Sequence, residues 1–411
     1  MNVLPTSIAA AGVLAAGIGL TATYAPQTST VAAADLAIHI EALASPAGEG
    51  SLEPQMTAGG GRTILSWLVR AGSRTSLQFA ERTPTGWTPV QTAASGTDFM
   101  INSADVPSVR RLGDGSVVAQ WLEEDGPDPE AYKLRLARSS DQGRTWSAPV
   151  SPHRDKVQTQ HGFASFFEPP AGGFGVVWLD GRAIDPDAPE GAGNMALRAA
   201  TFDRAGKQLG EVVVDARVCE CCQTAAASTT NGVLVAYRDR STGEVRDIVV
   251  RRLVAGRWSE PTTVHNDGWT IKACPVNGPA LAARGSEVAV AWFTGKGDVG
   301  HSFVVFSHDG GQTFGAPVGL DEGSSVGRVG VELLADGSAV ATWVDGSGER
   351  PSFMARRVEA TGRRGAVARI GESSGTRYPR VAQAAGEVLF AWTDTAGSSS
   401  SAVRVARAPI R

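Results

Sequence analysis

The feature that most constrains the fold is a short apolar run ending in an aromatic residue, which recurs seven times along the 411-residue chain. The aromatic residues are Trp67, Trp121, Trp178, Tyr237, Trp292, Trp343 and Trp392, and successive differences between their positions are 54, 57, 59, 55, 51 and 49. A period near fifty residues, with β-branched runs separated by Gly, Asp, Ser and Pro, is typical of four-stranded propeller blades. The sequence therefore predicts an all-β propeller of seven four-stranded blades, or of six if one copy is degenerate.

The last copy is one strand short, because after Trp392 only residues 402–408 remain as a further strand candidate. The segment 36–43 precedes the first full copy and alternates between apolar and polar residues. We expect this segment to be the missing outer strand, closing the ring with both chain ends in one blade and leaving few exposed edges. Residues 35–411 then form a single propeller domain.

Residues 7–25 are apolar and rich in Ala and Gly, and residues 26–34 are rich in Ala and Thr. This pattern resembles a secretory signal peptide, so we expect a secreted or periplasmic protein. Because no Lys or Arg precedes the apolar part, residues 1–34 also fit an N-terminal anchor and linker, and no other membrane contact is expected. The formal net charge of -4 and scattered Arg pairs give no basic surface for nucleic acid.

Two turns carry the same pattern, Ser-x-Asp-x-Gly-x-Thr-aromatic, at residues 139–146 and 307–314. In each turn the Asp carboxylate accepts backbone N–H bonds, the Gly permits a positive φ, and the aromatic ring fills the space between strands. The pattern resembles the Asp-box of sialidase-like (BNR-repeat) proteins. The resemblance implies that Asp141 and Asp309 lie between third and fourth strands, on the face opposite the active site, and are structural.

The resemblance also implies what a working sialidase needs, namely three arginines for the sugar carboxylate, a Tyr nucleophile with a Glu partner, and an Asp acid/base. The candidates are Tyr378, Arg182, Arg238 and Asp180, with Arg240, Arg328, Arg377 and Asp239 as further choices. The chain departs from the sialidase pattern because it has no Arg-Ile-Pro segment, and residues 109–112 are the nearest match. An ordinary structural interpretation places Tyr237 in the core and pairs Arg238 and Arg240 with Asp239 or Asp247 at the surface.

All four cysteines fall in two short segments, residues 219–222 and Cys274. Cys219 lies 18 residues before Tyr237 and Cys274 lies 18 residues before Trp292, so both segments occupy the same place in successive copies. We expect them to be neighbours at the start of two inner strands, beside the mouth of the central channel. His161 falls within one position of the same offset in the preceding copy, and His265 lies in the loop before Cys274.

Thiolates and imidazoles bind soft or borderline ions, notably Cu(I) and Zn(II). We therefore expect Cys219, Cys221, Cys222, Cys274, His161 and His265 to form a metal or redox site, with copper or zinc and no organic cofactor. The alternative is that the cysteines form structural disulfides, as is common in exported proteins. Bridges within residues 219–222 are strained, so only one relaxed bridge, to Cys274, forms readily.

Three functions from different classes fit this sequence. The first is an exported sialidase-like propeller with a Cys/His metal or redox site at its mouth. The second is an exo-sialidase-type glycoside hydrolase with bridged cysteines. The third is a noncatalytic propeller that binds a glycan or a protein. The expected partner is accordingly a metal ion or a small glycan.

Overall fold

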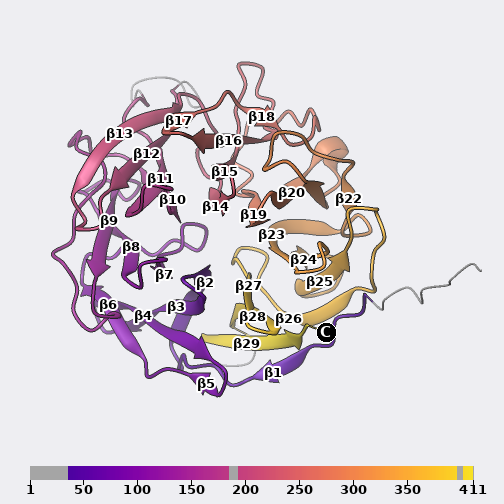
Figure 1. Ribbon diagram of the computed structural model, residues 1–411, viewed down its shortest axis with the longest axis horizontal. Helices are drawn as coiled ribbons and strands as arrows, with labels where there is room; N and C mark the ends of the chain where they lie inside the picture. The colour runs from indigo at the N-terminus through magenta and orange to yellow at the C-terminus, as the bar shows by residue number, and fades with distance from the viewer. Residues whose placement is uncertain (1–35, 185–192, 396–400, 411) are drawn as a thin grey trace, which may run out of the picture. The chain divides into compact units, whose positions relative to one another are not determined.

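The computed structural model describes residues 36–184, 193–395 and 401–410. The expected signal or anchor segment, residues 1–34, lies outside them. The described chain forms seven antiparallel sheets arranged in a ring, which confirms the seven-bladed propeller (Figure 1). Within the described residues, no helix has the length and apolar character required to cross a membrane.

The first four blades follow the chain from the inner strand outward. Blade one contains β2 (Ser51–Gly59), β3 (Arg62–Ala71), β4 (Arg74–Thr83), β5 (Gly86–Trp87) and β6 (Gln91–Gly96). Blade two contains β7 (Ser108–Arg111), β8 (Val117–Glu124) and β9 (Tyr132–Ser139). Blade three contains β10 (His161–Phe167), β11 (Phe174–Asp180), β12 (Ala196–Phe202) and β13 (Gln208–Asp215). Blade four contains β14 (Ala225–Thr229), β15 (Gly232–Arg238), β16 (Ile248–Val254), β17 (Arg257–Trp258) and β18 (Thr262–Thr263).

The remaining blades repeat this order. Blade five contains β19 (Ala280–Arg284), β20 (Glu287–Thr294), β21 (His301–Ser307) and β22 (Val318–Gly319), with a short 3₁₀ turn at Lys296–Asp298. Blade six contains β23 (Ser325–Leu333), β24 (Ala339–Asp345), β25 (Ser352–Val358) and β26 (Ala368–Glu372). Blade seven contains β27 (Arg380–Ala384), β28 (Glu387–Asp394), β29 (Ala402–Pro409) and β1 (Glu41–Leu43).

Blade seven closes the ring in the predicted way. Strand β1 pairs antiparallel with β29, with Glu41 opposite Arg407 and Leu43 opposite Val405. The outer strand therefore comes from the beginning of the described chain and the other three strands from its end (Figure 1). Hydrogen bonds between β1 and β29 thus join the two ends of the ring.

The recurring aromatic residues lie on the second strand of each blade and form the core between blades. Trp67, Trp178, Trp292 and Trp343 are at most 1% exposed. Trp178, for example, packs in one cluster with Leu122 and Leu134 of blade two. Six of the seven aromatic side chains are buried and Trp392 is half-buried, which explains why the sequence period marks the blades.

Both Asp-box turns have the expected structure. Asp141 accepts the N–H of Thr145 at 2.9 Å and its hydroxyl at 2.7 Å, and Asp309 binds Thr313 in the same way. The first turn follows β9 and precedes the bridge of Val150 to β9, and the second joins β21 to β22. The turns therefore lie between third and fourth strands, where they brace the sheets.

The seven inner strands surround the channel, which holds a cavity of about 580 Å³. Its wall includes one or more residues from every blade, such as Thr57, Ser108, Ser165, Ser228, Leu281, Glu332 and Val381. Gln223, Gly278 and Tyr378 also line it, just before β14, β19 and β27 respectively. We call the end of the channel at which the inner strands begin the mouth.

Candidate functional site

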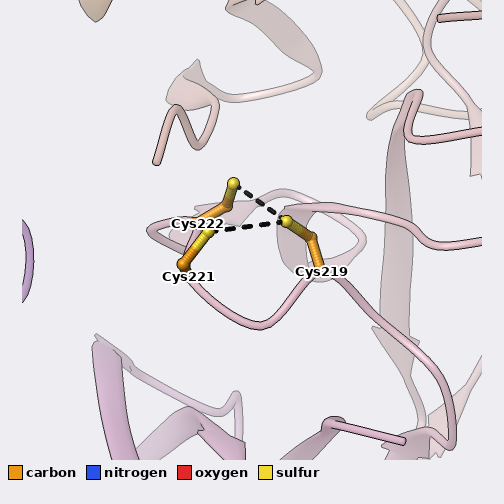
Figure 2. Close-up of side chains that lie close together, drawn as sticks. All are labelled: Cys219, Cys221 and Cys222. Atoms are coloured by element: carbon orange, nitrogen blue, oxygen red, sulfur yellow. Dashed lines mark hydrogen bonds between the residues drawn. The ribbon is translucent and has the colours of Figure 1, made fainter. Parts of the chain in front are cut away.

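The segment Cys219–Cys222 forms a turn that leads into β14 at the mouth. The N–H of Cys219 donates to the carbonyl of Arg238 at 3.0 Å, which fixes the start of the turn. The Sγ of Cys219 lies 3.1 Å from the Sγ of Cys222 and 4.0 Å from that of Cys221 (Figure 2). A looped backbone therefore gathers three sulfur atoms that an extended strand would point to opposite faces.

Cys221 and Cys274 form a disulfide, with Cα atoms 6.0 Å apart and a sequence separation of 53. This bridge confirms that the two cysteine segments are neighbours across blades four and five. Cys219 and Cys222 are free and buried, whereas Cys274 is exposed. The site thus contains one buried pair of thiols beside one bridge that reaches solvent.

Charges around Cys219 favour its thiolate form. Arg246 donates to the Sγ of Cys219 at 3.3 Å. Burial alone would raise the pKa of Cys219, but the hydrogen bond from Cys222 and the charges of Arg238 and Arg246 outweigh it and lower the pKa to about 6. Burial and the neighbouring Cys219 raise the pKa of Cys222. One thiolate and one protonated thiol therefore share this pair near neutral pH.

The prediction that Arg238 and Arg240 pair with Asp239 or Asp247 at the surface is wrong, because both arginines are buried, at 1% and 4% exposure. Arg238 donates to three main-chain carbonyls, those of Asn277, Arg246 and Phe293, at 2.6 to 2.9 Å. Its guanidinium also lies 5.1 Å from the Trp269 ring centre. Arg238 is thus a buried cross-link between blades four and five.

Arg240 and Arg246 instead enclose two glutamates. Arg240 pairs with Glu244 at 3.0 Å and with Glu220. Arg246 pairs with Glu220 at 2.7 Å and with Glu244 at 3.1 Å. Glu220, inside the cysteine turn, is therefore held by two arginines, and this arrangement fixes the turn.

The segment that follows Cys274 is bound to three blades at the mouth. The carbonyl of Val276 accepts from the hydroxyl of Tyr378 and from Arg328. The N–H of Asn277 donates to the Sγ of Cys222 at 3.4 Å, and its Oδ1 accepts the N–H of Arg328 at 2.9 Å. The bridge therefore joins the cysteine turn to a well-anchored segment.

Three inner strands bulge near the mouth, at Glu53, Phe163 and Arg328, where φ is 49°, 54° and 57°. The N–H of each residue is bound by a side chain from a neighbouring blade. The acceptors are Thr393 for Glu53 at 3.2 Å, Asp105 for Phe163 at 2.6 Å and Asn277 for Arg328 at 2.9 Å. Three inner strands thus share the same kind of bulge, which changes the direction of the side chains that lie at the mouth.

Tyr378 lies at the mouth between two arginines. The Nη1 of Arg328 donates to its hydroxyl at 2.7 Å, and the guanidinium groups of Arg328 and Arg380 lie 4.7 and 5.5 Å from its ring centre. Burial raises the pKa of Tyr378. Arg377 pairs with the buried Glu53 of blade one rather than pointing a free guanidinium at the tyrosine.

Arg182 and Asp180 lie together in blade three. Arg182 binds both carboxylate oxygens of Asp180, at 2.7 and 2.6 Å. The same arginine contacts Asp155 at 3.0 Å and Glu211 at 2.8 Å. The four glycosidase candidates thus enter three separate sets of contacts, around Asp180, Arg238 and Tyr378.

The two histidines expected beside the sulfurs contact other groups. His161 is fully buried in blade three, where its ring stacks on that of His153 at 3.8 Å. His265 is more exposed and its Nδ1 lies 2.8 Å from Asp267. Among the described residues, the potential metal-ligand group at the sulfurs contains Cys219, Cys221 and Cys222 and no histidine.

Asp105 is a residue that the sequence reasoning missed. It lies just before β7, is 2% exposed and binds the bulge at Phe163. Burial raises the pKa of Asp105 to about 7. A single Asp before a strand carries no sequence signal, since its burial depends on the approach of blade three.

Comparison with known proteins shows the fold. An α-L-arabinofuranosidase from Fusarium graminearum matches with 13% identity and a TM-score of 0.48, covering 75% of this chain and 96% of that chain. An intramolecular trans-sialidase from Ruminococcus gnavus matches with 12% identity and a TM-score of 0.45, covering 76% and 97%. The polysaccharide lyase Uly1 matches with 8% identity and a TM-score of 0.51, covering 86% and 89%. Of these three matches only that to Uly1 has a TM-score above 0.5, and it concerns the propeller fold alone.

The comparisons do not extend to sequence. No family model and no curated protein matches this chain. At such identities the likeness concerns the fold alone, and one fold hosts many functions.

Proposed function

We propose that this protein is an exported thiol–disulfide exchange protein whose reactive centre is the Cys219 and Cys222 pair beside the Cys221–Cys274 bridge. One observation carries this proposal. The Sγ of Cys219 lies 3.1 Å from a free thiol and 4.0 Å from a sulfur of the bridge. Thiolate attack on a disulfide sulfur is the elementary step of such exchange.

In the first step the Cys219 thiolate attacks the Sγ of Cys221. A Cys219–Cys221 bond forms, the Cys221–Cys274 bond breaks, and Cys274 leaves as a thiolate. Because Cys274 is exposed, this leaving group is solvated as it forms. The positive charges of Arg238 and Arg246 favour the attacking thiolate before the step.

In the second step Cys222 attacks the Sγ of Cys219. A Cys219–Cys222 bond forms, the Cys219–Cys221 bond breaks, and the proton of Cys222 passes to one of the released thiolates. Two thiols and one disulfide exist before and after, so the rearrangement needs no outside oxidant. It moves two reducing equivalents from the buried pair to Cys221 and Cys274.

The solvent-facing pair then exchanges with an external partner, for which we propose a disulfide of another exported protein or of a small thiol compound. That partner is reduced as Cys221 and Cys274 form their bridge again. Electrons reach the buried pair by the reverse route. The protein would thus cycle between a form with one disulfide, held by either pair, and an oxidised form in which both pairs are bonded.

Trapping with iodoacetamide tests the exchange in the full-length, folded protein. The reagent is added to the native protein at neutral pH, and mass spectrometry maps the labelled cysteines over time. We expect label to accumulate at Cys274, although this residue begins in a bridge. A Cys274 that is never labelled while the protein stays folded would overturn the proposal.

Two matched variants separate the steps. Cys219→Ser removes the attacking thiolate and should abolish labelling of Cys274. Cys222→Ser blocks only the second step, so Cys274 should still be labelled while Cys221 stays bridged to Cys219. Equal labelling of Cys274 in both variants would mean that the bridge opens without Cys219.

A second candidate is the binding of a soft metal ion, and the grouping of the Cys219, Cys221 and Cys222 sulfurs within 4.8 Å favours it. The bridge occupies Cys221, so two thiolates remain, and thiolates select Cu(I). Zn(II) sites need about four ligands, which this form does not supply. We propose Cu(I) as the ion that this site would take.

Competition with a chromophoric Cu(I) chelator tests this candidate. It predicts about one equivalent of bound copper. Binding should be lost in Cys219→Ser and in Cys222→Ser and kept in Cys274→Ser. If the chelator keeps all the copper, the protein does not bind Cu(I), and the thiol–disulfide exchange proposal is unaffected.

A further inference from the structure

A second cluster of ligand-type side chains lies on blade three, separate from the sulfurs. His161 begins β10 and pairs with Asp180 at the end of β11. His153 and Asp155 come from the linker that precedes β10. The ligand atoms of His153, Asp155 and His161 all lie within 4.8 Å of one another.

The ring of His161 points its second nitrogen into this cluster. Its Nδ1 lies 3.2 Å from the carbonyl oxygen of Thr159, which can only accept, so Nδ1 is the donor of this contact. Its Nε2 has no hydrogen-bond partner although the side chain is fully buried. A histidine whose other nitrogen donates to a carbonyl has the arrangement found in metal ligands.

Two carboxylates face this nitrogen, but both lie beyond the distance of a good hydrogen bond. The Oδ1 of Asp155 lies 3.4 Å from Nε2 of His161, and the Oδ2 of Asp180 lies 3.7 Å from it. The Nε2 atoms of His153 and His161 and the Oδ2 of Asp155 are all buried without a hydrogen-bond partner. Imidazole nitrogens and carboxylate oxygens gathered in this way are the ligand types that bind Zn²⁺.

The spacing of these atoms fits ligands that share one ion. His153 Nδ1 lies 3.5 Å from Asp155 Oδ2, close to the 3.4 Å between Asp155 Oδ1 and His161. These separations exceed a good hydrogen bond. Neighbouring ligands of a tetrahedral zinc, each about 2.0 to 2.1 Å from the metal, lie about 3.4 Å apart.

His153 supplies the adjustable ligand. Its Nε2 is buried without a hydrogen-bond partner, and its ring lies parallel to that of His161 at 3.8 Å. Two stacked rings do not point their lone pairs at one ion, so binding requires His153 to turn. The turn is feasible because His153 lies in a linker outside the strands, whereas His161 is fixed in β10.

The charge balance around the cluster leaves room for a cation. Asp155, Asp180 and Glu211 contribute three negative charges, and Arg182 and Arg198 contribute two positive ones through ion pairs of 2.6 to 3.0 Å. Arg182 therefore orients the carboxylates, and the three acidic side chains outnumber the two arginines that pair with them. Asp180 is held by hydrogen bonds from Arg182 and Trp178. The Oδ2 of Asp155 has an ion pair with Arg182 at 3.0 Å but no hydrogen-bond partner, so Asp155 is the better candidate for a ligand.

We propose that His153, Asp155 and His161 bind one divalent cation of the borderline class, for which Zn²⁺ is the probe. Three protein ligands leave a fourth position for water or a substrate oxygen, as in catalytic rather than closed structural zinc sites. This site is independent of the thiol exchange proposed above. It gives blade three a function that the cysteines do not supply.

Metal titration of the full-length protein, after treatment with a chelator, tests this site. Co²⁺ is used beside Zn²⁺, because its absorption distinguishes nitrogen and oxygen ligands from thiolates. We expect about one equivalent of Co²⁺ without a thiolate charge-transfer band, and a rise in the thermal midpoint on adding Zn²⁺. The same result should hold in Cys219→Ser.

The variants are placed in the linker to spare the fold. His153→Ala and Asp155→Asn should each weaken Zn²⁺ binding by about tenfold or more. Loss of a residue that only supports a metal ligand has an effect of this size, and loss of a ligand itself should be at least as large. The matched control is His265→Ala, which removes another histidine beside an aspartate at 2.8 Å. The proposal would be overturned if the wild type shows no saturable Zn²⁺ binding, or if His153→Ala binds Zn²⁺ with unchanged affinity. If Zn²⁺ binding is lost only in Cys219→Ser, the metal belongs to the sulfurs.

Discussion

The carboxylate of Asp105 accepts the main-chain N–H of Phe163 at 2.6 Å, so a side chain of blade two holds the bulge of blade three. Burial raises the pKa of Asp105 to about 7 despite this hydrogen bond. An acid whose pKa is higher in the folded than in the unfolded state binds protons more tightly when folded. The folded state therefore loses stability as the pH rises from the unfolded pKa to the folded one.

Asp105→Asn should remove this pH dependence, because the amide oxygen still accepts from Phe163 and does not ionise. In the wild type we expect the free energy of unfolding to fall between about pH 4 and pH 7, with this residue contributing at most about 4 kcal/mol. Urea unfolding across this range measures the effect. Asp98→Asn, at an exposed residue, is the control and should keep the wild-type slope. A slope unchanged in Asp105→Asn would show that Asp105 is ionised throughout.

Arg246 contacts the Cys219 sulfur, so its charge should control the thiol. Arg246→Gln should raise the pKa of Cys219 from about 6 towards the ordinary thiol value, by about one pH unit or more. The pH dependence of Cys219 alkylation measures this change. The control is Arg217→Gln. Arg217 also pairs with Glu244 but is not bonded to the Cys219 sulfur, so this change should leave the pH midpoint of Cys219 alkylation unchanged. Identical midpoints for all three proteins would contradict the assignment.

The Asp-box carboxylate should stabilise the fold at all but very low pH. Hydrogen bonds from the N–H and hydroxyl of Thr145 and from Ser139 lower the pKa of Asp141 to about 2. Because this pKa is depressed, the stabilisation is complete above the unfolded pKa and is lost as the pH falls towards about 2. Asp141→Ala should therefore lower the thermal midpoint at neutral pH, and the difference from wild type should shrink in acid. Ser140→Ala, at the variable position of this turn, should have little effect.

Tyr378 tests the glycosidase prediction. As a nucleophile it would support hydrolysis of a fluorogenic sialoside, with activity lost in Tyr378→Phe. Because its hydroxyl already binds the Val276 carbonyl and Arg328, we expect a structural effect instead. The free energy of unfolding should fall by about 1 kcal/mol, and neither protein should turn over the sialoside. Hydrolysis by the wild type alone would reverse this conclusion.

The fold follows from the sequence because the blade repeat is local. The aromatic residue of each second strand, the two Asp-boxes and the edge segment before the first copy each carry their own signal. The same repeat predicts that residues 219–222 and Cys274 are neighbours, since matching positions of successive blades lie side by side, and the Cys221–Cys274 bridge joins the two segments. The structural features that correspond to repeated sequence patterns are therefore those that could be predicted from the sequence.

The parts of the site that were missed depend on loops and on contacts between blades. The partner of His161 is His153, which lies in a linker of no fixed period. The burial of Arg238 depends on carbonyls of Asn277 and Phe293, which any residue types would provide. Neither contact is encoded by a residue pattern, so neither could be inferred without coordinates.

The pairing of β1 with β29 has a consequence for biosynthesis. Among the described strands, β1 is made first and its partner β29 is made last. A chain emerging from the ribosome therefore holds an unsatisfied edge until β29 has been made. The ring can be sealed only then, and loss of either strand leaves the same seam open.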